Sequence, residues 1–286
     1  MLIRTGYDIA FETEHEVPML ALLNVRPERQ GDLRTPEKLT TDPEVPLRTY
    51  TDSFGNIATR FTVPAGGITL SNDFVIEVSG DPDPVVPEAE QHAIADLPDD
   101  ALIYLLSSRY CDVDMLVDEA WRIIEGHDTG WARVQALVDA VNERITFDYM
   151  KADHNRTARM AWDGGHGVCR DFAHLAVTLC RAVNIPARYC TGYLGDIGID
   201  PIDAPMDFSA WFEAYIGGRW YTFDARHNTP RIGRIVMARG RDAVDTAITT
   251  AFGANRLVRF DLHTDEVADA DLSQSPDETA LPQSAA

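Results

Sequence analysis

The sequence predicts an α+β protein in which an N-terminal β-sandwich precedes a core of helices packed on an antiparallel sheet. Three observations support this fold class. Strand-like alternation dominates up to about residue 78, apolar residues at helical spacing follow from about residue 96, and residues 207–225 read as an aromatic-rich hairpin. With 286 residues, the chain is long enough for two domains.

The first domain, residues 1–80, is expected to be the sandwich. In IATRFTV, from Ile57 to Val63, apolar side chains alternate with polar ones, which is the period of a half-buried strand. Residues 52–56, DSFGN, have the composition of a tight turn. Residues 81–95 are rich in proline and acidic residues, and we expect them to form a linker.

The second domain is expected to span residues 96–263. Residues 97–110 and 129–145 both show helical spacing of apolar residues. Residues 264–286 are acidic and contain few apolar side chains, so we expect a disordered tail.

The segment HGVCRDFAHLAVTLCRAVNIPARYCTGYL predicts a loop, a helix that begins near Cys169 and ends at Asn184-Ile185-Pro186, and then a strand. In DFSAWFEAYIGGRWYTFDA, the pair Gly217-Gly218 separates two alternating runs, as in a two-residue hairpin. This register places Trp211 opposite Asp224.

Charge and cysteine usage limit the function. The 46 acidic and 25 basic residues give a formal net charge of −21, which disfavours nucleic acid and anionic membranes as partners. The N-terminal residues lack the pattern of a signal peptide, and the four cysteines have neither metal-ligand spacing nor a disulfide pattern. We therefore expect a cytoplasmic protein without a metal or another cofactor.

Cys169 is the candidate nucleophile. It follows Gly164, Gly165 and Gly167, so the backbone before it can turn tightly. A thiol at a helix N-terminus is favoured as thiolate, and the free N–H groups of the first turn can bind the oxygen of an attacked carbonyl. A buried structural cysteine is the alternative interpretation.

Three stretches, YTDSFGNIATRF, GVCRDFAHLAVTLCRAVNIPARYCTGYL and SAWFEAYIGGRWYTFDARHN, resemble the transglutaminase-like superfamily, in particular bacterial cysteine proteases with a β-rich N-terminal domain before a papain-like core. The resemblance implies a catalytic Cys, His and Asp. Cys169 and Asp224 occupy two of these positions. The histidine of the family stands immediately before Ala-Trp, where this sequence has Ser209.

A serine at position 209 is too short to bridge Asp224 to the thiol across a diagonal of about 7–8 Å, and it is not a base near neutral pH. Either another histidine serves as the base or the activity is lost. His227 is the first candidate, although it must turn toward Asp224 through a strand end or bulge at Arg226, and His166 in the glycine loop is the second.

The sequence thus predicts thiol-dependent acyl transfer on a protein or peptide substrate, with a thioester on Cys169 and with hydrolysis favoured over transfer to an amine. Trp162 and Trp211 are candidate substrate-binding residues. Because Ser209 replaces the expected histidine, the alternative is a catalytically impaired peptide-binding or interaction module. Ser209 itself as nucleophile has little support, since no G-x-S-x-G motif surrounds it.

Overall fold

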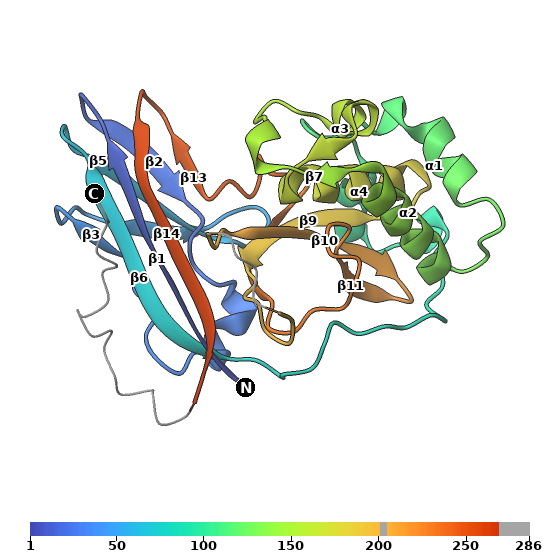
Figure 1. The fold of residues 1–286 in the computed structure, drawn as a ribbon, viewed down its shortest axis with the longest axis horizontal. Helices are drawn as coiled ribbons and strands as arrows, with labels where there is room; N and C mark the ends of the chain where they lie inside the picture. The colour runs from blue at the N-terminus through green and yellow to red at the C-terminus, as the bar shows by residue number, and fades with distance from the viewer. Residues whose placement is uncertain (201–204, 269–286) are drawn as a thin grey trace.

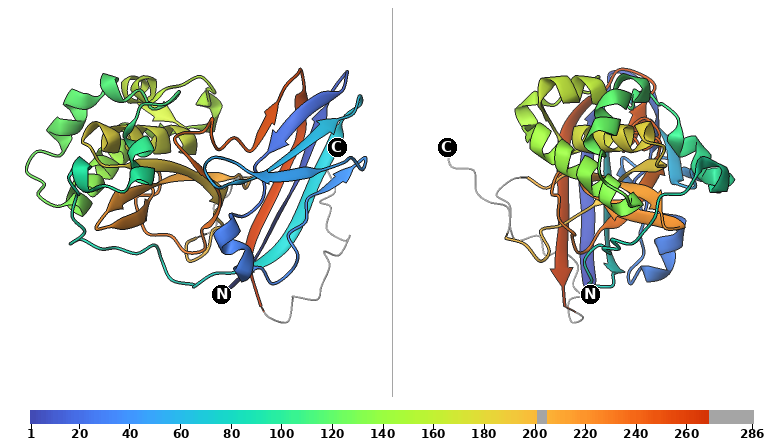
Figure 2. Two further views of the ribbon diagram at one scale, coloured as in Figure 1. Left: turned by 180° about the vertical axis from the view of Figure 1, so that it is seen from behind. Right: turned by 90° about the vertical axis from the view of Figure 1, so that its right-hand side faces the viewer.

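The computed structural model describes residues 1–200 and 205–268 and has an α+β fold (Figure 1). A sandwich of two β-sheets forms one side of the molecule, and helices packed on a third sheet form the other. The views in Figure 2 show the long strands of the sandwich standing beside this helical layer.

Each sheet of the sandwich has four strands. The first has the order β14-β1-β6-β3, with strands Arg256–Val267, Leu2–Glu12, Ile68–Glu77 and Thr40–Asp42. The second has the order β13-β2-β5-β4, with strands Thr249–Ala251, Val17–Ala21, Ile57–Val63 and Arg48–Thr51. Asp52 closes the turn before β5, because its carboxylate accepts the backbone N–H groups of Phe54 and Asn56, each at 2.8 Å.

The end of the described chain belongs to the sandwich, which corrects the expected boundary at residue 263. β14 pairs with β1 from Leu2 to Glu12, and Thr264 lies opposite Thr5. The expected tail therefore begins as strand, and its residues 269–286 lie outside the described residues. Val258, Phe260 and Leu262 do alternate with polar residues, but most β14 side chains are exposed, so the apolar pattern of this strand is short.

The third sheet has the order β11-β10-β9-β12, with strands Arg219–Phe223, Ser209–Ile216, Ala187–Tyr193 and Ile235–Gly240. The predicted hairpin is confirmed, since Ile216 lies opposite Arg219. Gly217 and Gly218 both have positive φ, at 57° and 79°, as a two-residue turn of this type requires.

Four α-helices cover this sheet: α1 (Val117–Ile123), α2 (Gly130–Arg144), α3 (Ala158–Gly164) and α4 (Cys169–Ala182). α4 is central, packs on β9 and β10, and is buried along most of its length. Two short strands, β7 (Thr146–Phe147) and β8 (His166–Gly167), pair in parallel beside it.

The remaining helices are short 3₁₀ segments: η1 (Pro27–Asp32), η2 (Ile94–Asp96), η3 (Asp99–Leu105), η4 (Val113–Met115) and η5 (Tyr149–Lys151). We expected an α-helix in residues 97–110, and η3 corrects this. Only Ala101 and Tyr104 of η3 are buried. A helix of this length needs a buried apolar face to persist, and η3 has too little of one.

One apolar cluster joins the sandwich to the third sheet. Tyr193 and Phe208 pack among sandwich residues, with Tyr193 6.0 Å from the ring of Phe74 and Phe208 6.3 Å from that of Tyr7. Between Glu77 and Ile94 the described chain has no helix or strand and runs along the molecule from the sandwich to the helices (Figure 1).

Thr264 tests the placement of β14, because a tail residue would tolerate any polar side chain. Thr264 is buried, and its hydroxyl lies 2.8 Å from that of Thr5. We expect Thr264→Asp to lower the free energy of unfolding by about 3 kcal/mol, since it buries a carboxylate with no cationic partner. Urea denaturation measures this, and the exposed neighbour Asp265→Ala is the control. Equal stability of the two variants would contradict the pairing.

Candidate active site

The start of α4 holds Cys169 in place. α4 begins at Cys169, and the carboxylate of Asp171 accepts the N–H of Val168 at 2.9 Å and the guanidinium of Arg156 at 2.9 Å. Gly167 is required for this approach, because a Cβ there would lie 2.6 Å from the Cβ of Asp171. The turn and the cap thus fix the thiol at the helix N-terminus.

The thiol of Cys169 lies against β10. Its side chain packs with the cluster that contains Ala210, and backbone hydrogen bonds from Ala210 and Arg170 favour its ionised form. Nevertheless, burial raises the pKa of Cys169 to about 11, the negative charge of Asp207 adds to the rise, and Arg226 opposes it.

This raised pKa corrects the expectation of a preformed thiolate. A charge at a helix terminus is stabilised by about 0.3–1 kcal/mol. One pKa unit corresponds to about 1.4 kcal/mol, so the helix contributes less than a unit and desolvation exceeds it. At neutral pH the thiol is protonated and needs a base.

Asp224 is buried immediately after β11, with a side chain that is 3% exposed. Its Oδ1 accepts the backbone N–H groups of Arg226 and His227, both at 3.0 Å. Its Oδ2 accepts His227 Nδ1 and a guanidinium N–H of Arg234, both at 2.8 Å. Despite burial, these charges and hydrogen bonds hold the pKa of Asp224 well below its usual range.

The side chain of His227 turns toward Asp224, as the role of base requires, because the strand ends before Arg226. β11 ends at Phe223, and a turn at residues 225–227 brings the imidazole back to Asp224. Because Nδ1 donates to this carboxylate, Nε2 is the nitrogen that can exchange a proton with a reacting group. The side chain of His227 is 18% exposed.

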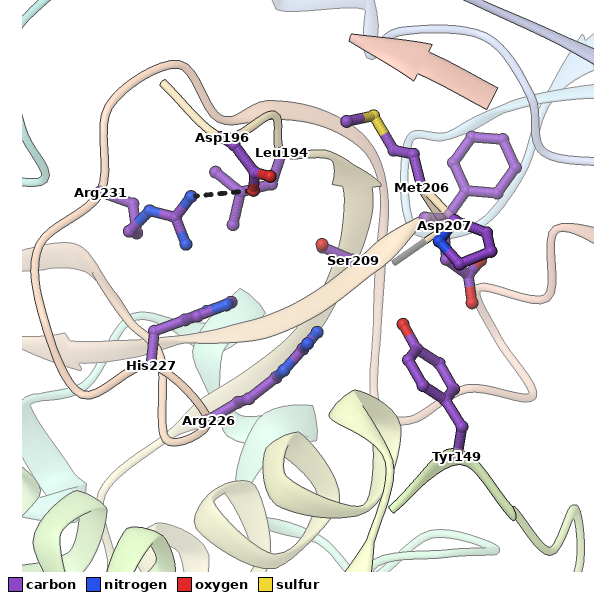
Figure 3. Close-up of a pocket in the computed structure, with 11 residues that line it drawn as sticks. Tyr149, Leu194, Asp196, Met206, Asp207, Ser209, Arg226, His227 and Arg231 are labelled. Carbon is purple, nitrogen blue, oxygen red and sulfur yellow. Dashed lines mark ion pairs between the residues drawn. The ribbon is translucent and has the colours of Figure 1, made fainter. Parts of the chain in front are cut away.

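A small pocket of about 60 Å³ lies between His227 and Ser209, the position where the family resemblance predicts a histidine. Ser209, Arg226 and His227 line it together with Asp207, and Figure 3 shows Arg226 and His227 extending from their loop toward Ser209. Asp207 and Arg226 are also the charges that act on the Cys169 thiol. Cys169 packs against Ala210, the residue after Ser209 on β10, so the thiol lies close to the strand that forms the wall of this pocket.

The structure does not bring three other candidates to this pocket. His166 Nδ1 lies 2.7 Å from the carbonyl oxygen of Gly164 within its own loop. Trp162 packs against the helical core and under Arg144. Trp211 is only 2% exposed and packs with Cys190 and Val236, so its indole has no open face for a substrate.

Sequence reasoning missed four residues of the site: Asp83, Asp207, Arg226 and Arg234. Arg234 joins Asp224 to Asp83, with 2.8 Å contacts to each carboxylate, and Asp83 comes from the segment expected to be only a linker. Asp207 and Arg226 are neighbours of Ser209 and His227 in the sequence. No local pattern indicates that the charges of Asp207 and Arg226 both act on the Cys169 thiol.

One family model matches the part of the chain that contains α4 and β11. Residues 119–225, which include Cys169 and Asp224, match the family model of the transglutaminase-like superfamily. Together with the α+β core and the thiol at the start of α4, this match makes residues 119–225 similar to the transglutaminase-like superfamily. The matched superfamily is one of thiol-dependent acyl transfer.

Individual relatives extend the similarity beyond the matched core. A crystal structure of “a Putative Cysteine Protease from Cytophaga hutchinsonii” is similar with a TM-score of 0.80 and 26% identity, over 93% of this chain and 90% of that chain. An uncharacterized protein of Mycobacterium leprae is 27% identical over 73% of this chain and 77% of its own length. Another from Mycobacterium bovis is 28% identical over 73% of each.

Within residues 1–200 and 205–268, no group of three or more His, Cys, Asp or Glu side chains is arranged to hold a metal ion. Within the same residues, no helix has the length and apolar character needed to cross a bilayer.

Arg234 tests the buried charge network. We expect Arg234→Met to lower the free energy of unfolding by about 3–5 kcal/mol, because Asp224 and Asp83 would lose their shared cation in a buried site. Arg256→Met is the matched control. Arg256 pairs with Glu12 on the surface, where a pair contributes less than about 1 kcal/mol. Similar losses in both variants, measured by urea denaturation, would argue against the network.

The raised pKa of Cys169 predicts slow alkylation at neutral pH. Only the thiolate reacts, so the rate with iodoacetamide should rise about tenfold per pH unit up to a midpoint near the pKa of about 11. Mass spectrometry of the modified peptide gives the rate, and Cys169→Ala gives the background from the other cysteines. A rate that reaches its plateau below pH 7 would instead indicate a preformed thiolate.

Proposed function

We propose that this protein is a cysteine hydrolase of peptide or carboxamide bonds, with Cys169 as nucleophile and His227 as base, oriented by Asp224. The hydrogen bond of 2.8 Å between His227 Nδ1 and Asp224 Oδ2 is the observation that carries the proposal. It supplies an oriented imidazole at the pocket where the family histidine is replaced by Ser209.

In the first step, Nε2 of His227 takes the proton of the thiol while the sulfur bonds to the substrate carbonyl carbon. The C–N bond then breaks, and the departing nitrogen receives the proton from the imidazolium. This leaves a thioester on Cys169. Water adds to the thioester with His227 again as base, and the products are a carboxylic acid and the free thiol. The scheme uses no cofactor.

Backbone N–H groups at the start of α4 are positioned to stabilise the oxyanion that forms during each addition. We favour water over an amine as the second reactant, because transfer requires a site that excludes water and no motif of the chain indicates one. The four free cysteines are consistent with a reducing compartment, and we place the protein in the cytoplasm on that basis.

The second candidate function is a peptide-binding or interaction module without turnover. Ser209 is the observation that favours it, because no imidazole precedes Ala210-Trp211 on β10. In this case the His227–Asp224 pair would serve stability, and the Cys169 thiol would remain unreactive.

Substitution of His227 separates the two candidates. We expect His227→Ala to lower kcat for hydrolysis of peptide p-nitroanilides by about 10²–10⁴-fold, the usual contribution of a general base. The exposed His154→Ala is the matched control, and His166→Ala tests the weaker candidate. Circular dichroism confirms that each variant folds.

Ser209→His completes the experiment. If His227 is the base, the wild type is active and Ser209→His brings no gain in kcat. An inactive wild type that gains activity through Ser209→His would instead support the impaired module. Unchanged activity of His227→Ala, together with loss in His166→Ala, would transfer the role of base to His166.

A further inference from the structure

Arg226 has an unusual position for an arginine of a strongly acidic protein. Its guanidinium carbon lies 3.8 Å from the centre of the Phe147 ring, and it interacts with the hydroxyl of Tyr149. No ion pair joins it to a carboxylate of residues 1–200 and 205–268. The guanidinium is thus oriented by a ring and retains N–H donors for another group.

The orientation of Arg226 directs these donors into the pocket. Its backbone N–H is bound to Asp224, which fixes the residue beside His227. Its side chain lines the pocket and extends toward Ser209 (Figure 3), and its charge acts on the Cys169 thiol. A group bound by Arg226 would therefore lie next to the reacting sulfur.

Arg231 adds a second positive charge to the same pocket. Its side chain is buried, donates to the carbonyl oxygen of Gly195 at 3.0 Å and lies 4.0 Å from Asp196. Its Nε is buried without a hydrogen-bond partner among the described residues. Asp196 and Asp207 also line the pocket, and the charge of Arg226 acts on Asp207, so the pocket holds carboxylates as well as guanidinium groups.

We propose that this pocket binds a carboxylate of the substrate through Arg226, with Ser209 as a further hydrogen-bond donor and the charge of Arg231 behind it. A guanidinium matches a carboxylate with two parallel N–H donors, and the pocket of about 60 Å³ admits a group of this size. This inference rests on the proposed function. If the protein is a hydrolase, its preferred substrates are acidic peptides whose carboxylate lies close to the bond that is cleaved.

Two alkylating reagents test the carboxylate site without any substrate. Iodoacetate and iodoacetamide differ by a carboxylate in place of a carboxamide, and both report the same thiolate fraction of Cys169. Their rate ratio is therefore insensitive to a change in the thiol pKa and isolates recognition of the carboxylate. Rates are measured at one pH and at about 0.15 M ionic strength, where the remaining surface charge is screened beyond about 8 Å.

We expect the iodoacetate-to-iodoacetamide ratio at Cys169 to exceed that of N-acetylcysteine by about tenfold or more, the effect of one charge-assisted hydrogen bond. Arg226→Gln should lower the ratio by about tenfold. Arg219→Gln is the matched control, because Arg219 also stacks on a ring, that of Tyr221, but is exposed at the hairpin turn. A wild-type ratio equal to that of N-acetylcysteine, or one that Arg226→Gln leaves unchanged, would overturn the proposal.

A second measurement uses only the wild type, so it tests the carboxylate site even if Arg226→Gln does not fold. Succinate should protect wild-type Cys169 from iodoacetamide, whereas succinamide should not, and equal protection by the two would also overturn the proposal. Turnover is read separately with peptide p-nitroanilides. A high alkylation ratio without hydrolysis would refute the hydrolase and retain the carboxylate site, and hydrolysis with no preference in alkylation would do the reverse.

Discussion

The candidate site depends on the hydrogen bonds and ion pair that hold the carboxylate of Asp224 in a buried position. Removing an ionised carboxylate from water costs several kcal/mol, so its burial requires compensation by oriented donors. Asp224 has four: two backbone N–H groups of the following turn, the imidazole of His227 and the guanidinium of Arg234. Through Arg234 and Asp83, the same charge ties the segment between Glu77 and Ile94 to the end of the β10–β11 hairpin. One set of contacts thus supports both domain arrangement and imidazole orientation.

Desolvation disfavours the charged form of both the Cys169 thiol, which is partly buried, and the Asp224 carboxylate, which is buried, but the two groups differ in how far their partners compensate. Asp224 has cationic and N–H partners on both oxygens, so its charged form persists. Cys169 has weaker compensation from backbone N–H groups and Arg226, and desolvation keeps it neutral. If His227 is the base, the neutral thiol transfers its proton to the imidazole during the reaction, and no ion pair exists beforehand. The cost of ionisation is then offset by interactions that form only with the carbonyl substrate.

Local patterns in the sequence predicted the parts of the site that depend on local structure. The helix start at Cys169 and the hairpin around Gly217-Gly218 follow from turn residues and periodicity, and the structure agrees with both. The partner of β14 could not be predicted from its own residues, because β14 pairs with β1, more than 240 positions away. The Arg234 network is similarly non-local, and the thiol pKa depends on burial, which no single segment encodes.

Ser209 stands where the family resemblance predicts a histidine, and it also lines the pocket. Position 209 starts β10 and lies at the wall of the cavity between Arg226, His227 and Asp207. An imidazole at this position would occupy volume that the small hydroxymethyl group leaves open. In the proposed function, a serine at this position supplies no base but leaves space for a substrate group in the pocket. If His227 acts as base, Ser209 is a specificity determinant, and its replacement by a larger ring would reduce the preference for carboxylates even where it restored the residue typical of the family.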